Sequence, residues 1–67
     1  MQNSDQIFKK AKNLHVEGQI KEAQKLYLKL IQKHKENDKL YFLLGTSFLQ
    51  IKKYNQAINY LNLSIKL

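Results

Sequence analysis

The sequence predicts an all-α fold in which two antiparallel helix–turn–helix hairpins stack side by side as a short α-solenoid. The first observation is an internal repeat, because residues 4–37 and 38–67 carry one pattern offset by 34 residues, and such a period is typical of helical arrays. The second is that apolar residues recur in both copies at the i, i+4, i+7 spacing of an amphipathic helix. The third is the lack of Pro- or Gly-rich linkers, which indicates short turns between antiparallel neighbours.

The first copy contains two expected helices. Ser4 is of the type that caps a helix, and Asp5 is favourable near the positive end of the helix dipole. Gly18 suits a left-handed position just after the end of this first helix. The apolar stripe of the first helix consists of Ile7, Ala11 and Leu14, and that of the second consists of Ile20, Ala23, Tyr27, Leu30 and Ile31.

The second copy repeats this arrangement. Asn37 and Asp38 form a turn and cap, and Lys52-Lys53 occupies the place of Gly18-Gln19. The third helix carries Tyr41, Leu44, Gly45 and Phe48, and the fourth, from about Tyr54 to the end, carries Ala57, Leu61 and Ile65. Residues 61–67 also alternate like a strand, but their register with the first copy favours a helix.

Small residues recur at equivalent positions of the two copies. Ala11 aligns with Gly45, and Ala23 aligns with Ala57. Helices approach to about 8–10 Å only where the facing side chains are small. We therefore expect these four positions to be the points of closest contact within the two hairpins.

The pattern resembles the tetratricopeptide repeat (TPR), and the resemblance covers almost the whole chain. The second copy carries the consensus residues at Tyr41, Leu44, Gly45, Phe48, Tyr54, Ala57, Leu61 and Ser64, and the first at Ile7, Ala11, Leu14, Ile20, Ala23, Tyr27 and Leu30. Lys10 and Lys35 depart from it, since an apolar residue and a proline stand there in the family. The resemblance implies a right-handed TPR-type solenoid preceded by a leader, residues 1–3.

TPR arrays are protein–protein interaction scaffolds that hold a peptide or partner helix in a concave groove lined by the first helix of each hairpin. The resemblance implies a groove lined by Asp5, Phe8, Lys12, His15, Val16, Lys39, Phe42, Thr46, Leu49 and Gln50. Such a groove suits a protein or peptide partner with apolar anchors and some acidic residues. The alternative is that Phe8 and Phe42 are only additional core between the repeats.

The charge leaves a second class of function open. The chain has twelve lysines, no arginine and a net charge of +7, which attracts polyanions such as nucleic acid or an anionic membrane surface. The lysines are distributed over several helix faces, and arginine, the usual residue for forked phosphate contacts, is missing. These observations favour a solvated surface over a nucleic-acid site.

Catalysis and cofactor binding have no support in the sequence, so we expect neither an enzyme nor a metal site. His15 and His34 lie on different predicted helices, and there is no cysteine, whereas a metal site needs three or four convergent ligands. The resemblance leaves room for a catalytic domain further along a longer parent protein.

The ends of the sequence support three further expectations. Residue 67 comes just before the Asp-Pro of the family pattern, and the last helix is apolar on an uncovered side, a candidate self-association face made of Ile58, Leu61 and Ile65. Two repeats are fewer than the three or so that such arrays need. We expect the N-terminal part of a longer TPR protein, with a homodimer as the alternative. With neither a signal peptide nor an apolar run long enough to cross a bilayer, we expect a soluble, cytoplasmic protein.

Overall fold

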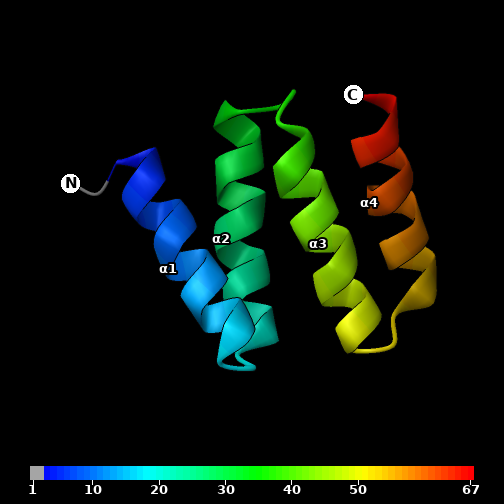
Figure 1. Cartoon of the computed structure of the whole chain (residues 1–67), viewed down its shortest axis with the longest axis horizontal. Helices are drawn as coiled ribbons and strands as arrows, with labels where there is room; N and C mark the ends of the chain where they lie inside the picture. The colour runs from blue at the N-terminus through cyan, green and yellow to red at the C-terminus, as the bar shows by residue number, and fades with distance from the viewer. Residues whose placement is uncertain (1–2) are drawn as a thin grey trace.

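The computed structural model describes residues 3–67, so residues 1 and 2 of the expected leader lie outside the described residues. The described part of the chain consists of four α-helices without any strand: α1 (Ser4–Val16), α2 (Ile20–Lys33), α3 (Asp38–Gln50) and α4 (Tyr54–Lys66). The helices lie side by side in chain order and alternate in direction (Figure 1). The all-α prediction is thus confirmed, including a helix rather than a strand at residues 61–66.

The helix ends follow local side-chain chemistry, with one correction to the prediction. Asn3, and not Ser4, caps α1: its side chain accepts from the Gln6 backbone N–H, and the Gln6 side chain accepts from the Asn3 backbone N–H. This reciprocal pair forms a capping box. Asn37 caps α3 as predicted, because its side chain accepts from the Lys39 backbone N–H at 3.0 Å.

The two hairpin turns have the same geometry although their sequences differ. After α1, the N–H of Gly18 donates to the carbonyl of His15, and that of Gln19 to Leu14. After α3, Lys52 and Lys53 make the equivalent bonds to Leu49 and Phe48. Gly18 has φ 87° and Lys52 has φ 64°. Lys52 therefore occupies a left-handed position that glycine occupies without steric cost.

Lys52→Gly is expected to raise the free energy of unfolding by about 0.5–1 kcal/mol, because it removes the steric cost of a side chain at positive φ. The reciprocal change, Gly18→Ala, should lower it by a similar amount, since no other atom lies within 4 Å of the added Cβ and only backbone strain is involved. Urea unfolding followed by circular dichroism measures both. Equal effects of the same sign would contradict this account of the turns.

The core lies where the two hairpins meet, and its main members come from three helices. Ala11, Ala23, Tyr27, Leu30, Leu40 and Leu44 form one buried cluster. Ala57 is also buried, and the Cβ position of Gly45 is occupied by Leu61 side-chain atoms. All four small-residue positions are therefore buried, as predicted. Lys10, which stands where the second copy has Leu44, is exposed.

A polar contact is buried between α2 and α3, the helices that join the two hairpins. The Gln24 side chain donates from Nε2 to Ser47 Oγ at 3.0 Å, and Ser47 Oγ donates to the Leu44 carbonyl. Among the described residues, no buried side-chain nitrogen or oxygen is left without a partner. A slide of one hairpin along the other would leave the Gln24 amide without this partner, which costs about 1–3 kcal/mol for a buried group, whereas Ser47 would keep its bond within α3.

Candidate functional site

The predicted groove residues lie on α1 and α3, which run in the same direction with α2 between them (Figure 1). Two cavities are lined jointly by these three helices, one near each end of the helices. Tyr27 and Leu30 of α2 line one cavity each. The groove is therefore a pair of hollows along α1 and α3, with α2 contributing to both.

The first cavity, of about 290 Å³, lies toward the C-terminal ends of α1 and α3. It brings together four of the predicted groove residues with two that the sequence prediction missed. It is lined by Lys12, His15, Val16, Tyr27, Leu43 and Gln50. Apolar surface, one ammonium group and three hydrogen-bonding side chains thus face a single cavity.

A chain of hydrogen bonds crosses this cavity and links three helices. His15 Nε2–H donates to the side-chain carbonyl oxygen of Gln50, and His15 Nδ1 accepts from the Tyr27 hydroxyl at 3.1 Å. Burial raises the pKa of the Tyr27 hydroxyl above its ordinary value of 10.0, because desolvation disfavours the phenolate. The hydroxyl therefore stays protonated and available as the donor.

The second cavity, of about 250 Å³, lies at the N-terminal ends of α1 and α3. It contains three predicted groove residues, Asp5, Phe8 and Lys39, and five others: Ser4, Leu30, His34, Asn37 and Leu40. His34 Nε2 and Ser4 Oγ share a hydrogen bond of 3.0 Å, which joins the end of α2 to the start of α1. Both ionic signs are present, since a carboxylate and an ammonium group line the same cavity.

The two phenylalanines have different surroundings. Phe8 is half-buried against the core cluster, and the Lys12 ammonium lies 5.1 Å from the centre of its ring, a cation–π geometry. Phe42 is 53% exposed and Leu49 is also exposed. Phe8 thus contributes both to the core and to the lining of the groove, whereas the Phe42 side chain is largely accessible to solvent. Thr46 is half-buried and donates to the Leu43 carbonyl.

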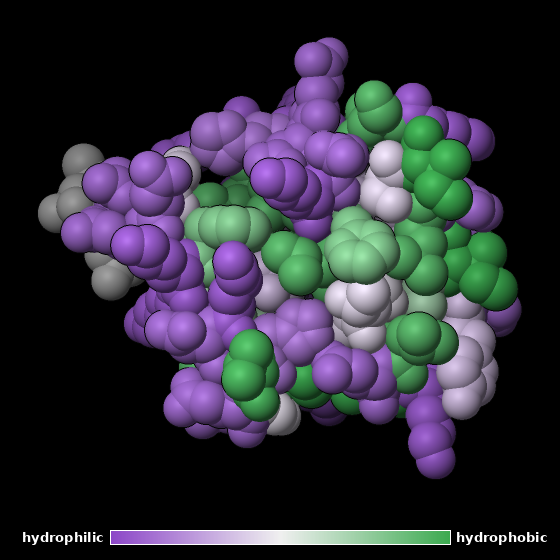
Figure 2. All heavy atoms as spheres, viewed as in Figure 1, coloured by the Kyte–Doolittle hydropathy of each residue, from purple (hydrophilic) through white to green (hydrophobic). Residues whose placement is uncertain are grey.

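The predicted self-association residues lie on α4, the outermost helix. Ile58 and Ile65 are exposed, and Leu61 is half-buried against Gly45. Figure 2 shows that hydrophobic side chains gather over the α3 and α4 side of this face, whereas polar side chains cover much of α1 and α2. The apolar surface is thus concentrated toward one edge of the molecule.

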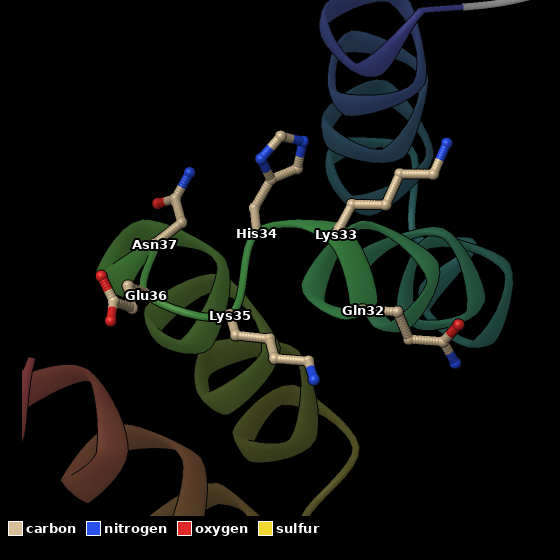
Figure 3. Close-up of a pocket in the computed structure, with 6 residues that line it drawn as sticks. All are labelled: Gln32, Lys33, His34, Lys35, Glu36 and Asn37. Atoms are coloured by element: carbon tan, nitrogen blue, oxygen red, sulfur yellow. The ribbon is translucent and has the colours of Figure 1, made fainter.

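A further hollow of about 560 Å³ lies at the turn between α2 and α3 and is lined by residues 32–37. Its six side chains point in different directions (Figure 3), and all are exposed. These side chains therefore do not converge on a position where a ligand could be held. Across residues 3–67, no three His, Asp or Glu side chains are grouped so that they could hold a metal ion.

Four lysines form a ridge that the sequence prediction, which described lysines distributed over several faces, did not single out. Lys21, Lys25, Lys29 and Lys33 follow one another at intervals of four residues along α2, and all are exposed. Consecutive members are about 6 Å apart along the helix axis. Lys25 and Glu22 form an ion pair of 3.6 Å, which contributes little at such an exposed position.

No family model, curated protein or solved structure matches this chain. None of the helices formed by residues 3–67 has the length and hydrophobicity that a membrane-spanning segment requires.

Proposed function

We propose that this chain is a protein–protein interaction module of the TPR type, a short right-handed α-solenoid that holds a peptide or partner helix in the groove along α1 and α3. The 34-residue period, the four buried small-residue positions and the order of the hairpins support the proposal. The observation that carries it is the pair of cavities, because seven of the ten groove residues line one or the other.

The side chains on the two groove helices suit a partner with both apolar and acidic side chains; of the predicted groove residues, Phe42, Thr46 and Leu49 line neither cavity. Phe42, Leu49 and Val16 are exposed apolar side chains on the two groove helices. A few side chains supply most of the energy of protein recognition, and aromatic residues are enriched in interfaces, so Phe42 is the main anchor of this set. Lys12 and Lys39 each line one of the cavities, so that acidic side chains flanking the apolar anchors would be attracted.

Phe42→Ala is expected to weaken peptide binding at least tenfold, because an aromatic anchor is removed. It should lower the free energy of unfolding by less than about 1 kcal/mol, because about half of the Phe42 side chain is exposed to solvent. The probe is the tightest binder selected from a displayed library of random peptides, measured by fluorescence anisotropy. Tyr54→Ala is the matched control, since Tyr54 is 55% exposed against 53% for Phe42 but lies on α4.

Three results would count against the groove. They are selection of no peptide, equal losses for the two variants, or a loss of stability in Phe42→Ala large enough to account for the loss of binding. A selected peptide without apolar residues would contradict the proposed partner chemistry.

The lysine ridge of α2 favours a second candidate function, the binding of single-stranded nucleic acid. Its four ammonium groups lie on the exposed side of α2, away from Tyr27 and Leu30, which line the groove cavities. Contacts of lysine with successive phosphates release counterions, so affinity falls linearly with the logarithm of the salt concentration. The ridge offers charge but no aromatic side chain on which a base could stack.

If the ridge binds nucleic acid, the affinity for an oligothymidylate probe should fall with a log–log salt slope of about −3, since each contacted phosphate contributes about −0.7. Replacing Lys21, Lys25 and Lys29 by glutamine should then reduce the slope by about two units. The control carries the same change of charge at Lys35, Lys52 and Lys53, which lie in the turns. Identical slopes for both triple variants would exclude a ridge-specific site.

A further inference from the structure

We propose that a second copy of this chain docks on α4, forming a twofold symmetric dimer in which two α4 helices pack antiparallel. The proposal is independent of the groove along α1 and α3. It concerns an apolar stripe made of Tyr54, Ile58, Leu61 and Ile65, called the α4 stripe below. These residues are separated by four, three and four positions, the spacing that places side chains along the seam of a two-helix coiled coil.

The internal repeat shows that the corresponding face of α2 is covered. Gln24 of α2 is 8% exposed, whereas its counterpart Ile58 is 56% exposed. Tyr27 is fully buried, whereas its counterpart Leu61 is only half-buried. In the first copy, α3 covers this face with Leu40 and Leu44, which join the core cluster. Within residues 3–67, therefore, no helix covers the α4 stripe, which is more apolar than the covered face of α2.

The α4 stripe is complementary to itself in antiparallel orientation. When Tyr54 faces Ile65 of the second copy, the same register places Ile58 opposite Leu61, so every stripe residue meets another stripe residue. A twofold interface requires such self-complementarity. The seam also carries isoleucine and leucine, which pack well between two helices.

The charge distribution favours this side of the molecule for contact between copies. Each copy carries a net charge of +7, so most approaches between two copies are repulsive. Within α4, Lys66 is the one charged residue, and Asn55, Asn59 and Asn62 flank the stripe. Nine of the twelve lysines precede residue 40 and lie outside α4. The other three are Lys66 and, just before α4, Lys52 and Lys53, and the register places Lys53 opposite Lys66 of the second copy, so the repulsion is confined to the two ends of the interface.

The α1 helix of another copy is poorly suited to dock on the α4 stripe in the way that α3 docks on α2. Gln6 and Lys10 of α1 stand where α3 has Leu40 and Leu44. Burying an unpaired ammonium group is costly, so a head-to-tail chain of copies is disfavoured. The closed pair is the arrangement that covers the α4 stripe of both copies.

The contact area makes the dimer a weak one. A helix of 13 residues is about 20 Å long and about 10 Å wide with its side chains. Two such helices bury less than the roughly 800 Å² per partner of stable complexes, so we expect a weak dimer that forms only at high protein concentration. Screening of the repulsion should make the dimer tighter as salt rises from low to physiological concentration.

Sedimentation equilibrium of the 67-residue chain tests the proposal over about 20 μM to about 1 mM, the range in which weak encounters are populated. The weight-average mass should rise from 8.0 kDa toward twice that value. Ile65→Lys should weaken the dimer at least tenfold. Val16→Lys is the matched control. It adds the same charge at a similarly exposed position, since Val16 is 87% exposed against 80% for Ile65, but Val16 lies on α1.

An isotope-filtered nuclear Overhauser contact between the Tyr54 ring of one copy and the Ile65 methyl groups of the other is expected in the dimer. A mass that stays at 8.0 kDa throughout would overturn the proposal, as would a mass that grows beyond two copies. Equal weakening by Val16→Lys, or a dimer without the Tyr54–Ile65 contact, would also overturn it. Ile58→Lys provides a second variant should the Ile65→Lys protein melt at a lower temperature than the parent.

Discussion

Leu44→Ala is expected to lower the free energy of unfolding by about 2–5 kcal/mol, the range for deleting a buried leucine side chain. Leu44 is completely buried in the cluster where the two hairpins meet. A chain of 67 residues has a total stability of only about 3–10 kcal/mol. The variant should therefore be substantially unfolded at 37 °C, which urea titration followed by far-ultraviolet circular dichroism measures.

Lys10→Ala is the control for this prediction, because Lys10 occupies the same position of the first repeat and is exposed. Surface substitutions of this kind usually change stability by less than about 0.5 kcal/mol. If Lys10→Ala were as destabilising as Leu44→Ala, this would contradict the assignment of Lys10 to the solvated surface and of Leu44 to the core.

Gly45→Leu is expected to destabilise the chain by about 3 kcal/mol or more, because α3 and α4 touch at this glycine. An added Cβ would meet the Leu61 side chain at 2.6 Å and the Leu61 backbone nitrogen at 3.1 Å. The side-chain clash can be relieved by rotation, but the approach of the backbone nitrogen cannot. The better helix propensity of leucine offsets only about 1 kcal/mol of this cost.

A double-mutant cycle checks the origin of this effect. In a Leu61→Ala background, Gly45→Leu should cost at least about 1 kcal/mol less than in the parent, because the atoms it strikes have been removed. The rescue should be incomplete, since the backbone of α4 remains in place. The same cost in both backgrounds would place the strain somewhere other than the contact between α3 and α4.

The sequence was sufficient to predict the helices and the residues where they touch. The period of 34 residues and the apolar spacing defined four helices, and the small residues Ala11, Ala23, Gly45 and Ala57 lie buried as expected. The predicted cap of α1, Ser4, was wrong by one residue, because asparagine and serine are both favourable at a helix N-cap. The side chain of Gln6, which pairs with Asn3, distinguishes them in the structure.

The groove could be predicted only as a set of residues and not as a shape. Which helices carry the residues follows from the repeat, but the separation into two cavities depends on how Tyr27 and Leu30 of α2 fill the space between α1 and α3. The bond from His15 to Gln50 joins residues 35 positions apart. It depends on the rotamers of both side chains, which helical spacing does not specify.

The main contacts between helices join consecutive helices: α1 with α2, α2 with α3, and α3 with α4. Since partners are close along the chain, only short segments must be closed before each contact forms, and low contact order of this kind accompanies folding in microseconds to milliseconds. α1 packs chiefly against α2, so it can detach without separating the other three helices. Loss of structure can therefore begin at the edge and proceed helix by helix, as in a one-dimensional array.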